Sequence, residues 1–150
     1  METKQKKELL KGALITGAVN SGIQYFLLKD HAPIAISVDS ITNTDHTVLG
    51  SAVALVITLS MISTIIGYFN IKVEKVAFYP TIFWLTIKHG FFTFGVVTSL
   101  AVLWQNYMGT VEVSLIFALV IIGVIASTVS GVINYLTLNK SVIVEESINQ

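Results

Sequence analysis

Four long apolar runs dominate this sequence of 150 residues, and few folds can accommodate them. At about 1.5 Å per helical residue, each run is long enough to cross most or all of a hydrocarbon core of about 30 Å. Inside a bilayer the backbone amides must find partners in their own helix or in a closed barrel. The predicted spans are residues 9–28, 48–69, 81–104 and 113–138. The sequence thus predicts an all-α fold, an integral membrane four-helix transmembrane bundle forming one domain over residues 1–150.

Composition narrows the function classes. Only 12% of the residues are charged, about half of what a soluble domain carries. The chain has no Cys, which excludes thiol redox relays, Cys-ligated metals and disulfides. It has no Arg either, so there is no guanidinium clamp for phosphate and no basic patch for nucleic acid.

Lysine is distributed unevenly around the four spans. Under a four-span topology, only Lys29 falls on one side of the membrane. The other side carries Lys4, Lys6, Lys7, Lys11, Lys72, Lys75 and Lys140. The positive-inside rule then predicts that both the N and the C terminus are cytoplasmic. The loop over residues 29–47 faces outward, with an extended segment at 34–38 and Asp45 or Thr47 capping the next helix, and residues 139–150 form a polar tail.

The first and last spans carry small residues at the same spacing. A shift of 110 residues overlays one span on the other without a gap. Small residues on one helix face let two backbones approach closely, so these positions predict helix packing. The predicted packing residues are Ala13, Gly17, Ser21, Gly123, Ser127 and Gly131. Because the two spans run antiparallel, they are better interpreted as one packing seam than as a duplicated transporter half. The matching residues can also have arisen independently, because apolar helices are built from few types of residue.

Five polar residues at membrane depth are candidates for a pathway or vestibule. Asn20, Gln24 and Asn134 can either hydrogen-bond across helices or line a path for a solute. Lys88 and His89 interrupt the third span, and ionisable residues inside spans are functional hypotheses by default. One interpretation places them at the cytoplasmic rim, with Lys88 extending to the interface. The other is a cationic vestibule in which His89 titrates near neutral pH.

No catalytic residue, cofactor or metal is predicted. His31, Asp39, Asp45 and His46 in the outward loop are of metal-ligating types, but their spacing matches no defined motif, so a solvated loop is expected. The spans contain no Asp or Glu, which argues against a carboxylate proton relay.

Several segments resemble short bacterial membrane proteins of unknown function, some of which are labelled permeases. The likeness is carried by the runs at 11–17 and 21–24, by Asp39-Ser40-Ile41, by the run at 46–50 and by the run at 84–92. It covers most of the chain. The resemblance implies a multi-pass protein of the bacterial inner membrane and brings no functional residues with it.

These observations favour a permease- or channel-like protein that moves a small solute or ion, surrounded by the lipid bilayer and working as a homo-oligomer. One alternative is a non-catalytic membrane partner or regulatory subunit that packs through its small-residue helix faces. Another is a membrane enzyme acting on a lipid or quinone with His89 as the acid–base group. The absence of Cys, of intramembrane carboxylates and of a metal motif makes the enzyme the weakest of the three.

Overall fold

The computed structural model describes residues 3–38, 46–71 and 74–142. Within these ranges the chain forms four long helices and two short strands. The helices are α1 (Thr3–Leu28), α2 (Val48–Phe69), α3 (Phe83–Met108) and α4 (Leu115–Ser141). The strands are β1 (Ile34–Ile36) and β2 (Val111–Val113), and a short π-helical turn, η2 (Phe78–Ile82), leads into α3. The predicted predominantly helical fold is confirmed. Residues 39–45 of the predicted loop and 143–150 of the predicted tail lie outside the described residues.

The helix ends follow from local capping. Thr47 caps α2, its side-chain oxygen accepting a hydrogen bond from the Gly50 amide at 3.2 Å. Ser114 caps α4 in the same way, through the Phe117 amide at 3.4 Å. Gly109, at a φ of 68°, ends α3 in a conformation that other residues rarely adopt. The predicted span 48–69 therefore matches α2 at both ends, whereas α1 begins before residue 9 because its Lys- and Glu-rich start continues the helix.

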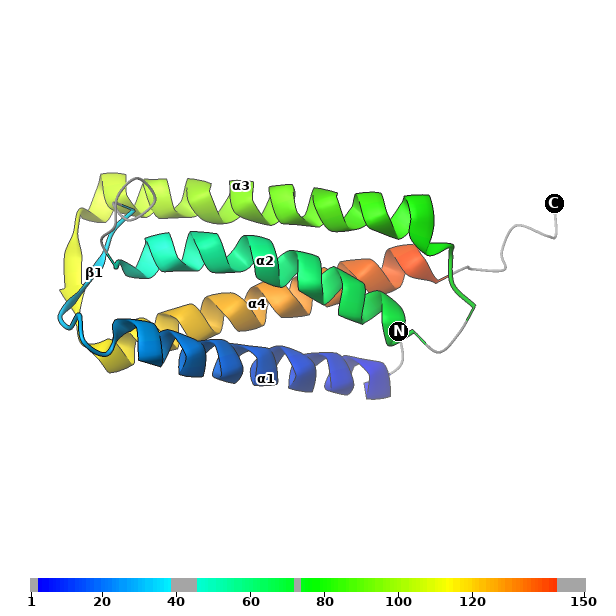
Figure 1. The fold of residues 1–150 in the computed structure, drawn as a ribbon, viewed down its shortest axis with the longest axis horizontal. Coiled ribbons are helices and arrows are strands. Elements are labelled where there is room, and N and C mark those ends of the chain that lie inside the picture. The colour runs from blue at the N-terminus through cyan, green and yellow to red at the C-terminus, as the bar shows by residue number, and fades with distance from the viewer. Residues whose placement is uncertain (1–2, 39–45, 72–73, 143–150) are drawn as a thin grey trace.

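The order of the helices in space differs from their order in the chain. α1 packs along α4, α4 packs along α2, and α2 packs along α3 (Figure 1). α1 and α3 are therefore the outer helices of the arrangement. α1 and α4 lie side by side although residues 29–114, more than half of the chain, separate them.

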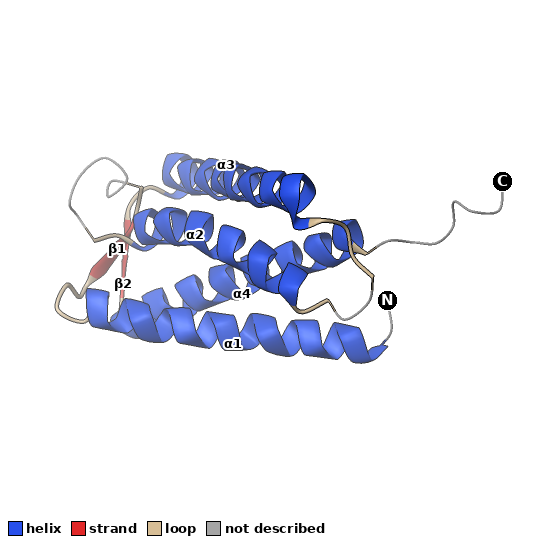
Figure 2. Cartoon of the chain, turned by 45° about the vertical axis from the view of Figure 1, so that its right-hand side comes forward, coloured by secondary structure: helices blue, strands red, loops and turns tan. Residues whose placement is uncertain are grey.

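A two-stranded antiparallel sheet closes one end of the helices (Figure 2). β1 and β2 pair with Ile34 opposite Val113 and Ile36 opposite Val111. Part of the segment predicted to be extended, 34–38, thus forms a strand. At the other end, the Val76 amide donates to the Ser141 carbonyl at 3.0 Å and ties the α2–α3 connection to the end of α4.

Apolar side chains fill the spaces between helices and also cover the outside. Three buried clusters follow one another along the helices, built around Leu28 and Val48, around Val56 and Ala126, and around Tyr68 and Ile82. On the outer surface, large apolar side chains are more than half exposed on every helix: Phe26, Ile66, Phe91 and Ile116. A surface of this kind is stable in an apolar solvent and would drive association in water.

Three helical segments are long and apolar enough to cross a membrane. They are Val48–Phe69, Phe78–Met108 and Leu115–Ser141. Among the described residues α1 is long enough but not apolar enough to be included, because polar residues such as Asn20 and Gln24 lower its mean hydropathy. The structure thus supports a membrane protein. That α1 spans the bilayer, and that the termini are cytoplasmic, remain predictions.

Candidate functional site: the polar layer between the helices

α1 and α4 approach closely at two glycines. A Cβ atom on Gly17 would lie 2.6 Å from the carbonyl oxygen of Gly123, and one on Gly123 would collide with the Ser21 hydroxyl. Ser21 uses that hydroxyl to donate to the Leu119 carbonyl at 2.9 Å. Glycine is therefore a packing requirement at position 17, whereas a side chain at position 123 would displace the Ser21 hydroxyl.

The residues of the two matched stripes meet in antiparallel order. Ala13 lies against Gly131, Gly17 against Ser127, and Ser21 against Gly123. Residue numbers thus rise along one helix as they fall along the other. All six predicted packing residues lie in this seam.

A chain of hydroxyl groups crosses from α2 through α4 to α1. The Ser63 hydroxyl donates to the Ser130 oxygen at 3.4 Å, and Ser130 donates to the Thr16 oxygen at 3.4 Å. Asn134 also donates to the Ser130 oxygen, at 3.3 Å. Ser130 is thus the junction of this polar layer. At these distances each bond is weak on its own.

The side-chain amides of Asn20 and Asn134 lie between the helices and make contacts there. Asn20 is buried and donates to the Thr16 carbonyl of its own helix at 2.8 Å. The amide oxygen of Asn134 occupies the space left by the missing side chain of Gly67, where a Cβ atom would come within 2.6 Å of it. Gln24 differs, because its buried Oε1 has no hydrogen-bond partner among the described residues.

His89 is buried between α3 and α2, with 7% of its surface exposed. Its Nδ1 atom lies 2.8 Å from the Thr64 hydroxyl, which itself donates to the Ser60 carbonyl at 2.8 Å. Because a hydroxyl has one proton, the Thr64 oxygen accepts from His89. This network assigns the proton of the neutral imidazole to Nδ1.

Lys88 and His89 do not share an environment, although they are adjacent in sequence. His89 faces α2, whereas the Lys88 side chain is exposed on the outer side of α3. The structure therefore does not bring them together in one vestibule. It links His89 instead to Thr64, a partner that the sequence analysis missed because a threonine in an apolar helix has no distinguishing pattern.

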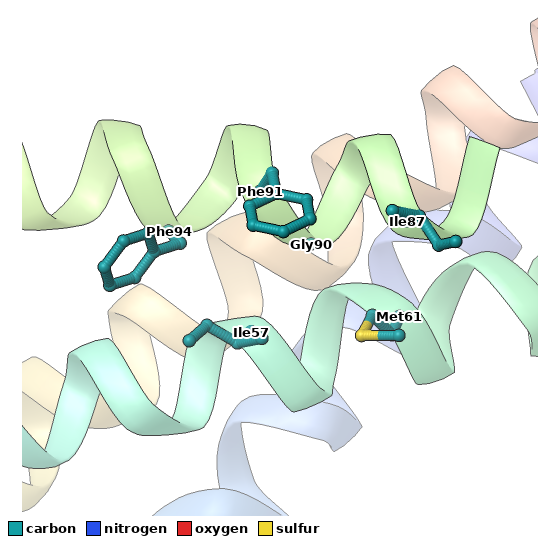
Figure 3. A pocket seen from close by; sticks show the side chains of 6 residues that line it. All are labelled: Ile57, Met61, Ile87, Gly90, Phe91 and Phe94. Carbon is teal, nitrogen blue, oxygen red and sulfur yellow. The ribbon is translucent and has the colours of Figure 1, made fainter. Parts of the chain in front are cut away.

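Two hollows lie on the outer surface of the described residues. One, of about 390 Å³, lies between α2 and α3, as Figure 3 shows. It is lined by Ile57, Met61, Ile87, Gly90, Phe91 and Phe94. The second, of about 470 Å³, lies on the α1–α4 seam near Ala13 and Gly131. Both are mainly apolar, and none of the five pathway candidates lines either of them.

Comparisons of the chain with protein-family models, curated proteins and solved structures found no match.

Proposed function

We propose that this protein is a non-catalytic membrane partner that associates through the exposed face of α3, and that the helix it binds is α3 of a second copy. The main support is the position of α3 at the edge of the helix arrangement, where it packs mainly along α2 and touches α4 only slightly. Its outer face carries Gly95 and Ser99 one turn apart, both exposed. A Cβ atom on Gly95 would meet nothing within 4 Å.

Small residues four apart on an exposed face let a second transmembrane backbone come close. In the α1–α4 seam the same type of residue is already used for internal packing, whereas Gly95 and Ser99 are exposed on α3. Ala18 and Gly22 form a similar exposed pair on α1, and the test below compares the two faces. Copies inserted in one orientation related by a two-fold axis would place their α3 helices parallel. Gly95 would then face its own counterpart.

The type of membrane, the side on which the termini lie and the spanning of the bilayer by α1 are part of the same proposal. We place the protein in the bacterial inner membrane as a multi-pass protein with cytoplasmic termini, following the distribution of lysine. α1 then crosses the bilayer as a fourth span. Packing against α4 supports this, since Asn20 is buried and the hydroxyl of Ser21 donates to the Leu119 carbonyl of α4.

The absence of Cys allows a direct test. Single Gly95→Cys or Ser99→Cys variants in membranes should form disulfide-linked dimers on mild oxidation, whereas Ala18→Cys on the exposed surface of α1 should not.

Gly95→Ile should reduce the dimer fraction without affecting the fold, because the monomer has room for the side chain. Gly22→Ile is the matched control, since Gly22 is equally open but lies on α1. Monomer in all wild-type samples, or equal dimer in both isoleucine variants, would contradict the proposal.

A permease-like function of an oligomer is the second candidate. The buried, unpartnered oxygen of Gln24 favours it, since an acceptor at membrane depth is costly unless something binds it. Gln24→Met removes that acceptor with little change in volume. Loss of ion or solute flux in liposomes with an intact fold would support a path past Gln24. Equal flux in wild type, Gln24→Met and protein-free liposomes would exclude it.

A further inference from the structure

We infer that His31 and His46 form a two-imidazole site for a divalent transition-metal ion at the end of the molecule closed by β1 and β2. The two residues are 15 positions apart, and the sequence pattern alone favours a solvated loop. The structure brings their rings together, with centroids 4.2 Å apart and planes tilted by 54°. This site is independent of the function proposed for α3.

The backbones that carry the two rings are fixed by buried neighbours. His31 follows α1, and its amide donates to the carbonyl of the fully buried Leu28 at 3.0 Å. His46 directly precedes Thr47, which is buried, caps α2 and donates to the Ser37 carbonyl at 2.8 Å. The proximity of the rings therefore follows from the packed ends of α1 and α2.

The geometry suits chelation by neighbouring nitrogens. With metal–nitrogen bonds of about 2.0 Å, two imidazole nitrogens on one ion stand roughly 3 Å apart. Rotation about the broad χ2 wells of two rings already in contact can reach this separation. Both side chains are exposed, which leaves the other coordination positions open to water.

The ligand set selects the class of ion. Imidazole suits copper, nickel, zinc and iron, whereas calcium and magnesium take oxygen ligands. Among the described residues no third His, Asp or Glu completes a group with the two imidazoles, so a closed four-ligand zinc site does not arise from these residues. An ion that accepts two adjacent imidazoles and water fits better. Copper(II) has the highest affinity of the divalent series for such ligands.

The experiment is a titration of the purified, untagged full-length protein in detergent with Cu²⁺ alone. We expect one ion per chain and an electron paramagnetic resonance spectrum showing hyperfine coupling to two imidazole nitrogens. His31→Ala and His46→Ala should each weaken binding by roughly tenfold or more, since each removes one of two protein ligands. Asp30→Asn, a neutral substitution beside His31, is the matched control and should bind as wild type does.

Four results would overturn the inference. These are no binding by the wild type, equal binding by the His31→Ala/His46→Ala double variant, loss in only one of the single variants, and loss in Asp30→Asn. Circular dichroism and elution volume in detergent check that each variant is folded. Neither histidine packs inside the helix core, so the substitutions should leave the fold intact.

Discussion

Gly17 of α1 and Gly123 of α4 face each other so closely that a Cβ atom on Gly17 would lie 2.6 Å from the Gly123 carbonyl oxygen. This contact joins the helix that begins the structure to the helix that ends it. It also makes the α1–α4 seam the most easily tested feature of the fold.

Gly17→Ala should destabilise the protein. The added methyl group meets backbone and the Ser127 side chain, so the helices must separate, at a cost of about 1–3 kcal/mol. Thermal unfolding in detergent measures the change. Gly12→Ala is the control on the same helix, because its Cβ would meet nothing within 4 Å. Equal midpoints for the two variants would show that the close approach does not exist.

Thr64→Val should destabilise the α2–α3 contact. The substitution keeps the shape of the side chain but leaves the Nδ1 proton of the buried His89 without its acceptor, at a cost of about 1–3 kcal/mol. Thr64→Ser retains the hydroxyl and should be close to wild type. Denaturation in detergent compares the three proteins, and ¹⁵N spectra of the imidazole report the tautomer. A wild-type spectrum with the proton on Nε2 would contradict the assigned network.

Labelling from either side of the membrane should show whether α1 spans it. In the predicted topology, Lys7→Cys and Lys140→Cys are reached by an impermeant thiol reagent from the cytoplasmic side, and Asp30→Cys from the outer side. All three side chains are exposed, and no native thiol competes. Labelling of positions 7 and 30 from the same side would mean that α1 does not cross the bilayer.

Lys88→Gln should strengthen the proposed dimer. Lys88 lies two helical turns from Gly95 on the outer side of α3, so a two-fold dimer brings two ammonium groups toward each other. Removing this repulsion should raise the association constant roughly two- to tenfold at low ionic strength and less at high salt. Energy transfer between labelled copies in liposomes can measure it. A weaker dimer, or an effect independent of salt, would place Lys88 away from the dimer axis.

The sequence predicted those features that depend on local pattern. The long apolar runs located the four helices, and Thr47 was one of two expected caps for α2 because a hydroxyl before an apolar run has a specific role. The predicted first span begins at residue 9, whereas α1 begins at Thr3, since charged residues can continue a helix outside the hydrocarbon region.

Contacts between residues that are far apart in the sequence are harder to predict from it. The partner of His89 is a threonine 25 positions earlier, and any of several hydroxyl groups in α2 could have served. The contact of His31 with His46 depends on how the ends of α1 and α2 are packed. The spacing of the two residues in the sequence does not predict this packing. Their adjacency in sequence predicts a shared site for Lys88 and His89, whereas successive helical residues point in directions about 100° apart, so one is exposed and the other buried.

The placement of α4 between α1 and α2 has a consequence for how the chain is assembled during synthesis. The ribosome produces α1 before α4, the helix along which α1 packs, and α2 and α3 are made in between. Until Leu115–Ser141 has been made, the face of α1 that carries Ala13, Gly17 and Ser21 lacks the helix against which it packs. The least apolar helix of the molecule is therefore secured last, and a chain that stops after α3 would lose the contact that holds its beginning.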